Sequence, residues 1–286
     1  MLVRHRKAIL LGTGLLGTYW GWRTWRQWQL ENDKRLTPDR YVGLELTEKE
    51  QLTHDAFRLR LATERQSSLF PVLSCLYVKD DMIQVMRAYT PINDPFKDGY
   101  VDLIVKRYEN GSVSRMLSKT AVHDKIFVRG PMVEYDYQPN RFEEIGMIAG
   151  GTGITPMYQL ARRVLQNPDD KTRLWLIYAN KTEQDILLRK ELDQLQEQYK
   201  DRFKIYYVLE RPPKESWQGG QGYVNEDMVK SMVAENAHCQ RLILVCGPDA
   251  MLAHVSGQRA KDFSQGPVRG ILGRMGFKSN EVFKLE

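Results

Sequence analysis

The spacing of hydrophobic residues changes near residue 139 and divides the chain into two parts. Between residues 40 and 137, short runs rich in β-branched and aromatic side chains alternate with turn pairs such as Asn110 and Gly111. The strands expected from these runs lie at residues 56–61, 84–89, 101–108 and 125–128. Several short strands within about 100 residues favour a small antiparallel β-barrel over residues 41–138.

Beyond residue 139, strand and helix patterns alternate. The hydrophobic runs that predict buried strands lie at residues 145–149, 174–178, 205–209 and 242–245. Helical spacing of hydrophobic residues follows at 157–165, 185–199 and 225–233. This alternation predicts a doubly wound parallel sheet, with helices on both faces, over residues 139–286. The fold class expected is therefore β followed by α/β, and a length of 286 residues suits two domains.

Residues 1–30 have a different character from the rest of the chain. Residues 8–22 carry no charge, and Arg and Lys flank them on both sides. Fifteen residues are fewer than the ~17–25 that a transmembrane helix needs, but Trp20, Trp22, Trp25 and Trp28 suit the headgroup zone. We expect a retained single-pass membrane helix at 1–30 and a polar linker at 31–40. A cleaved signal peptide, a mitochondrial presequence and a buried helix are the alternatives.

Composition and charge narrow the classes of protein. Hydrophobic residues make up 42% and charged residues 27%, which excludes a wholly disordered chain. Residues 1–40 carry a net charge of +5 and the remaining 246 residues only +1, so the body lacks the basic surplus of a nucleic-acid-binding protein. Three cysteines without a CxxC pair give neither a disulfide framework nor a metal site, and they favour a reducing compartment.

Two motifs carry candidate chemistry in the second half. Gly150 to Pro156 connects a predicted strand to a predicted helix, where backbone N–H groups can approach a pyrophosphate. Cys246, Gly247 and Pro248 follow the last hydrophobic run and open the next helix. Because ligands bind at the carboxyl ends of parallel strands, both motifs are expected to line one cleft. The alternatives are an ordinary turn and a buried structural cysteine.

Two further motifs lie in the first half. Arg87 and Tyr89 share one face of a predicted strand, and Ala88 and Thr90 share the other. Residues 111–114 precede a helix expected at 115–119 and form a second candidate phosphate site. A sheet edge with a paired arginine is the alternative interpretation of the first motif.

The order of the four motifs along the chain is specific. R-x-Y-T-x-I at 87–92, G-x-x-S at 111–114, GGTGITPM at 150–157 and C-G-P-x-x-M at 246–251 resemble the NADH-cytochrome b5 reductase family, in its membrane-anchored fungal type. This family lies within the ferredoxin-reductase-like flavoproteins, and the resemblance extends from about residue 41 to the C-terminus. It implies that the barrel binds FAD and that the α/β domain binds NADH.

The resemblance also assigns roles to residues. Arg87 corresponds to a pyrophosphate clamp, Tyr89 to a residue that packs on the flavin, and Thr90 to a hydroxyl near flavin N5. The other implied FAD contacts are Ala88, Ile104, Lys106, Gly111, Val113 and Ser114. Two departures are Ala88, where a proline is common, and Ser112, where many members carry a lysine thought to help dock cytochrome b5.

In the α/β domain, Cys246 corresponds to the cysteine beside the nicotinamide and is, with Thr90, the implied catalytic residue. Glu210 corresponds to an acid that binds the adenine ribose hydroxyls and disfavours NADPH. Thr155 corresponds to a threonine that contacts the flavin. The remaining implied cofactor contacts are Gly150, Gly151, Thr152, Gly247, Pro248 and Met251.

The activity implied is hydride transfer from NADH to FAD, followed by release of single electrons to a separate acceptor such as cytochrome b5 or a related heme protein. One alternative is a membrane-tethered flavin reductase with a quinone or another non-heme acceptor. Another is a scaffold or assembly protein that keeps the fold without turnover. The expected location is the mitochondrial outer membrane or the endoplasmic reticulum, with the body in the cytosol.

Overall fold

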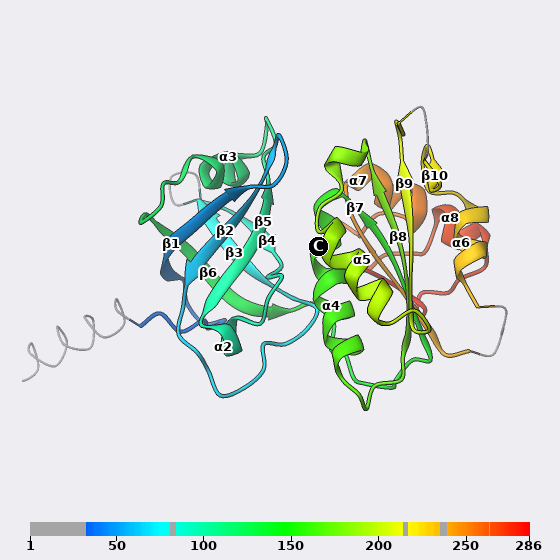
Figure 1. Ribbon diagram of the computed structural model, residues 1–286, viewed down its shortest axis with the longest axis horizontal. Helices are drawn as coiled ribbons and strands as arrows, with labels where there is room; N and C mark the ends of the chain where they lie inside the picture. Colours follow the sequence, from blue (N-terminus) through cyan, green and yellow to red (C-terminus); the bar gives the residue numbers. More distant parts are fainter. Residues whose placement is uncertain (1–32, 81–83, 214–216, 235–238, 263) are drawn as a thin grey trace, which may run out of the picture.

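The chain forms two domains that lie side by side in the computed structural model, which describes residues 33–80, 84–213, 217–234, 239–262 and 264–286 (Figure 1). The membrane helix expected at 1–30 lies outside these residues. Within the described part of the chain, no helix is both long and apolar enough to cross a bilayer.

The first domain is a curled antiparallel sheet of six strands in the order β4-β3-β6-β1-β2-β5. Its elements are β1 (Val42–Gln51), β2 (Ala56–Ala62), β3 (Ser74–Asp80), β4 (Val85–Tyr89), α2 (Pro95–Asp98), β5 (Tyr100–Lys106), α3 (Ser112–Lys119) and β6 (Lys125–Val133). Just after β4, the Ile92 N–H donates to the carbonyl of Asp102 in β5 at 3.0 Å. The two ends of the sheet therefore meet, and the core inside is rich in leucine.

Helix α3 begins at Ser112, three residues before the predicted helix at 115–119. Gly111 is its N-cap, and Val113 and Leu117 are buried on its inner face. The four-residue spacing of these two apolar positions favours a helix that includes residues 112–114. The sequence prediction places these residues in a loop, so the predicted helix is about one turn too short.

The second domain is a six-stranded parallel sheet in the order β10-β9-β8-β7-β11-β12. Its strands are β7 (Glu144–Gly150), β8 (Arg173–Asn180), β9 (Phe203–Leu209), β10 (Gly220–Gln221), β11 (Arg241–Cys246) and β12 (Val282–Lys284). Its helices are η1 (Gly151–Gly153), α4 (Ile154–Gln166), η2 (Glu183–Asp185), α5 (Arg189–Gln198), α6 (Glu226–Met232), α7 (Asp249–Val255) and α8 (Gly270–Arg274). Residues of α4 and α5 pack into one core, and residues of α6, α7 and α8 pack into another. This arrangement confirms the prediction of helices on both faces.

The strand order reverses between β7 and β11. The chain moves outward from β7 to β10 and then returns to place β11 on the other side of β7. Cys246, the last residue of β11, pairs with Ala149 near the end of β7. Ligands of open α/β sheets bind outside the carboxyl ends of the strands at such a reversal, so the fold places the glycine-rich loop and Cys246 at the expected position.

Candidate functional site

A cleft of about 520 Å³ is lined by residues of both domains. One wall comes from β4, β5 and the start of α3, and the other from η1, α4 and the segment after β11. The predicted site residues that line it are Arg87, Ala88, Tyr89, Thr90, Ile104, Lys106, Gly111, Val113, Ser114, Thr152, Thr155, Cys246, Gly247 and Pro248. The structure thus gathers all four motifs around one cavity.

The β-domain wall presents a cation, an aromatic ring and a buried hydroxyl from one short strand. Arg87 is exposed, and its Nη1 donates to the carbonyl of Met86 at 2.8 Å. Burial raises the pKa of Tyr89, so its phenol stays neutral across the physiological range. Thr90 is buried at the end of this strand.

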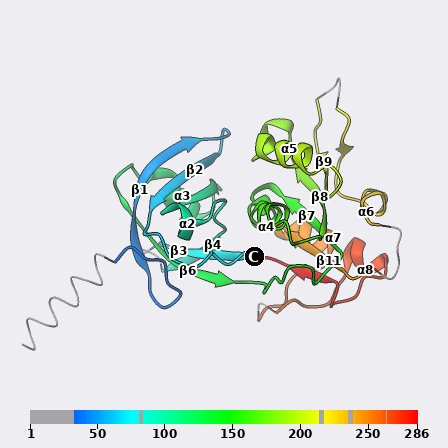
Figure 2. The same ribbon diagram turned by 60° about the horizontal axis from the view of Figure 1, so that its bottom comes forward.

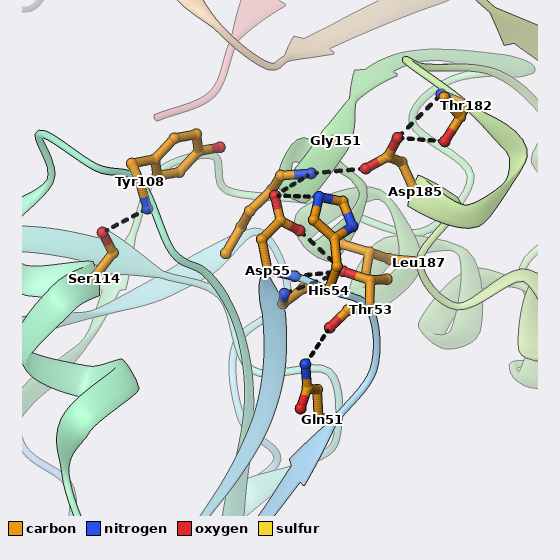
Figure 3. A network of polar contacts seen from close by, with 12 residues as sticks. Gln51, Thr53, His54, Asp55, Tyr108, Ser114, Gly151, Thr182, Asp185 and Leu187 are labelled. Atoms are coloured by element: carbon orange, nitrogen blue, oxygen red, sulfur yellow. Dashed lines mark hydrogen bonds and ion pairs between the residues drawn. The ribbon is translucent and has the colours of Figure 1, made fainter. Parts of the chain in front are cut away.

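The start of α3 completes this wall. The Ser114 hydroxyl accepts the Tyr108 N–H at 3.2 Å (Figure 3). It also donates to the Gly111 carbonyl at 3.1 Å. These bonds fix the loop before the helix, so that Gly111, Ser112 and Val113 line the cleft. The first backbone N–H groups of a helix favour an anion, which suits a phosphate group.

The opposite wall is built from glycine-rich backbone. Gly151 has a φ of +54°, and its carbonyl accepts a hydrogen bond from the buried Tyr178 hydroxyl at 2.9 Å. Thr155 Oγ1 donates to the Thr152 carbonyl at 3.1 Å and closes the turn into α4. A Cβ at Gly153 would overlap the carbonyl oxygen of Cys246. Close approach of the β7 and β11 loops therefore requires glycine at residue 153.

Cys246 is buried at the end of β11, and burial raises its thiol pKa to about 12. The thiol is consequently neutral at physiological pH, and its Sγ donates to the carbonyl of Glu286 at 3.5 Å. A neutral, buried thiol suits packing and polarisation better than nucleophilic attack.

Lys106 takes part in a bridge between the domains as well as lining the cleft. Its Nζ lies 3.2 Å from Asp55 of the first domain and 3.2 Å from Asp185 of the second. Burial lowers the Lys106 pKa, but the two carboxylates outweigh it and the net direction is upward. Thr182 donates to Asp185 through its N–H and its hydroxyl, and Figure 3 shows the two acids facing each other across the domain boundary.

Four predicted residues do not line the cleft, as far as the described residues show. Gly150 and Gly151 begin the glycine-rich loop but do not line the cleft, and Met251 packs so close to Gly150 that a Cβ there would overlap its sulfur. Glu210 lies exposed just after β9, where its N–H donates to the Asn180 carbonyl at 3.0 Å.

The cleft also includes residues that were not predicted for the site, namely Tyr108, Ser112, Gly153, Pro156, Asp249 and Glu286. All but Glu286 lie inside or next to the four motifs, and that proximity was a usable signal. Glu286 reaches the cleft only because β12 pairs in parallel with β11.

Comparisons with known proteins agree with this geometry. The family described as oxidoreductase FAD-binding domain matches residues 43–137, and oxidoreductase NAD-binding domain matches residues 147–257. NADH-cytochrome b5 reductase 2 of Aspergillus oryzae is 40% identical over 282 residues, which cover 96% of this chain and 87% of that protein. The chain belongs to the NADH-cytochrome b5 reductase family.

Further relatives of this reductase support the same conclusion. NADH-cytochrome b5 reductase 2 of Aspergillus niger is 42% identical over 249 residues, covering 85% of this chain and 77% of that protein. The cytochrome b5 reductase domain of Ulva prolifera nitrate reductase has a TM-score of 0.74 at 33% identity, covering 87% of this chain and 98% of that chain. The predictions of an oxidoreductase with an FAD-binding and an NAD-binding domain are thereby confirmed.

Proposed function

We propose that this chain oxidises NADH, reduces bound FAD and passes single electrons to cytochrome b5 or a related heme protein. The observation that carries the proposal is the single cleft in which Arg87, Thr90 and the start of α3 face Thr152 and Cys246. The names of the relatives support the choice of donor and acceptor.

The residues present fit FAD on one wall and a nicotinamide nucleotide on the other. Arg87 and the N-terminal turn of α3 supply positive charge and N–H donors for the FAD pyrophosphate. Tyr89 at the end of β4 and Thr90 just after it orient the ring system, and Thr152 and Gly153 line the opposite side of the cleft for the dinucleotide. When bound, FAD accepts hydride from the nicotinamide and releases electrons one at a time. Cys246 holds the nicotinamide in position as a neutral packing group.

Anaerobic NADH titration of the purified protein tests this directly. We expect a yellow protein that bleaches on adding NADH and recovers its colour when oxidised cytochrome b5 is added. Bleaching followed by recovery with a quinone but not with cytochrome b5 would favour the non-heme acceptor. A colourless protein, or one that does not respond to NADH, would favour the scaffold alternative.

We further propose that residues 1–30 anchor the protein in the mitochondrial outer membrane or the endoplasmic reticulum, with the body in the cytosol. The support is the uncharged run at 8–22, its tryptophan-rich flank and the net charge of +5 in the first 40 residues. A chain that begins at Arg35 should lose membrane pelleting and keep full activity with ferricyanide. Persistent pelleting in high salt would contradict a sole anchor at the N-terminus.

A further inference from the structure

Two glutamates are in contact beside the cleft, outside the four motifs. Glu286 follows β12 and lines the cleft, and Glu134 follows β6 at the start of the connection between the domains. The Glu134 carboxylate accepts the Glu286 N–H at 2.7 Å. Figures 1 and 2 both show the C-terminus between the two domains.

Glu286 is held by both domains. Tyr77 of β3 donates its hydroxyl to the Glu286 carboxylate at 3.1 Å, and Cys246 of β11 donates its thiol to the Glu286 carbonyl. The preceding residue, Leu285, extends the pairing with β11 through a 2.9 Å hydrogen bond to Val245. The main chain of Glu286 is therefore fixed beside Cys246. Burial raises the pKa of the Cys246 thiol, and the charges of Glu134 and Glu286 both act on this thiol and raise its pKa further.

The charged and titratable groups around Glu134 come from four other elements. Burial raises the Glu134 pKa to about 7, the Glu286 N–H lowers it, the Glu286 charge raises it and Arg259 lowers it. Burial also raises the thiol pKa values of Cys75 and Cys246, and that of the Tyr77 phenol to about 12, so these three groups stay neutral. Deprotonation of Glu134 above neutral pH consequently adds one negative charge to a cluster that also contains Glu286 and Arg259.

The two redox states of the nicotinamide ring differ in charge. The ring of NAD⁺ carries a positive charge, and the ring of NADH is neutral. We propose, resting on the proposed function, that Glu286 and Glu134 make this site prefer the oxidised nicotinamide ring and that Glu134 makes the preference depend on pH. A carboxylate within several ångströms of a cation in a partly exposed cleft changes its affinity by about three- to tenfold. Product inhibition by NAD⁺ then increases as the pH rises through neutrality.

The test compares two ligands that do not reduce the flavin. The oxidised holoenzyme is titrated with NAD⁺ and with 1,4,5,6-tetrahydro-NAD, whose ring is uncharged, while the flavin spectrum is followed at about pH 6 and about pH 8. The ratio of the two Kd values cancels any effect that is common to both dinucleotides. We expect NAD⁺ to gain about three- to tenfold over the analogue between these pH values.

Variants separate charge from structure. Glu134→Gln should abolish the pH dependence of the ratio, and Glu286→Gln should weaken the NAD⁺ preference at both pH values. Tyr77→Phe removes a hydrogen bond but neither carboxylate, so it should keep the pH dependence. Glu197→Gln, on the exposed side of α5, is the matched control and should behave as wild type.

Two outcomes are distinguishable. A ratio that is equal at both pH values in the wild-type enzyme would overturn the inference, whether or not the variants fold. A protein that neither bleaches with NADH nor binds either dinucleotide would instead overturn the proposed function.

Discussion

The two walls of the cleft are built in opposite ways. The β-domain wall presents long or polar side chains, with Arg87 and Tyr89 on β4 and Thr90 directly after it. The α/β wall depends on missing side chains, because a Cβ at Gly153 would overlap backbone of β11 and one at Gly247 would lie 2.9 Å from Met251.

This difference predicts two kinds of mutant. Removing a side chain from the β-domain wall deletes a contact with the cofactor and leaves the sheet intact. Adding one methyl group at Gly153 on the α/β wall forces the ends of two central strands apart. Substitutions in the β-domain wall are therefore expected to lose cofactor, and substitutions in the α/β wall are expected to lose stability.

The largest effect is expected for Gly153→Ala. The new Cβ would overlap the Cys246 carbonyl oxygen and lie 2.9 Å from the Gly247 nitrogen, and backbone on a central strand cannot move easily. We expect the free energy of unfolding, measured with urea, to fall by about 3 kcal/mol.

Gly222→Ala is the control for this substitution. Gly222 has a φ of +84°, but a methyl group added there would meet no atom within 4 Å, so only backbone strain of about 1 kcal/mol is expected. Equal losses in the two variants would refute the steric argument.

Arg87→Ala, in the β-domain wall, should lose FAD while the protein stays folded. Its guanidinium is exposed on β4, so the fold should survive, and loss of a charged hydrogen bond should weaken FAD binding by about thirtyfold. The ratio of flavin to protein after purification measures the loss. Arg58→Ala removes a half-buried arginine that pairs with Glu50 in the same domain and should retain FAD. Wild-type flavin content in Arg87→Ala would show that another group binds the pyrophosphate.

Elements with one strong hydrophobic pattern were predictable from sequence. The run at 145–149 became β7, which is buried throughout, and the flanking glycines marked the loop that follows it. Strand β1 was not predicted, because its second half, Thr47 to Gln51, is polar and its alternation covers only Val42, Leu44 and Leu46. Strand β3 carries a buried serine and cysteine that dilute its apolar signal.

The site was predictable where its residues lie in continuous motifs. The partners of Lys106 were not, because Asp55 and Asp185 come from separate domains and meet only after these dock. The position of Glu286 depends likewise on a parallel pairing between β11 and β12 that no local pattern specifies.

Lys106→Met tests the bridge that joins the two walls. It removes the ammonium between Asp55 and Asp185, and we expect about 1.5 kcal/mol less stability at neutral pH. The net pKa of Asp185 is lowered, since burial raises it but hydrogen bonds from Thr182 and Lys106 outweigh that. A carboxyl group whose pKa is lowered in the folded state stabilises the fold at pH values above its pKa in the unfolded chain, which is about 4. This stabilisation is lost as the pH falls through the lower pKa of the folded state.

The difference between wild type and Lys106→Met should accordingly shrink on acidification, which urea unfolding at several pH values measures. Lys200→Met, at an exposed position just after α5 that pairs with Glu197, should leave stability unchanged. A constant difference at all pH values would mean that Lys106 acts through packing alone.

Glu210→Thr is expected to have the smallest effect, and that effect is on the preference for NADH over NADPH. Glu210 belongs to the α/β domain but does not line the cleft. It is exposed after β9, and the exposed Lys181 and Arg211 lie beside it, joined by a backbone hydrogen bond of 2.9 Å. Repulsion of a 2′-phosphate by this carboxylate is therefore screened by solvent and opposed by two cations. We expect the preference for NADH over NADPH, measured as the ratio of kcat/KM values, to narrow by about threefold at low salt and by less at high salt. Flavin content should not change, and Glu197→Thr should preserve the ratio. An unchanged ratio in Glu210→Thr would show that another residue discriminates between the ribose of NADH and the 2′-phosphate of NADPH. A much larger change would indicate direct contact between Glu210 and the dinucleotide.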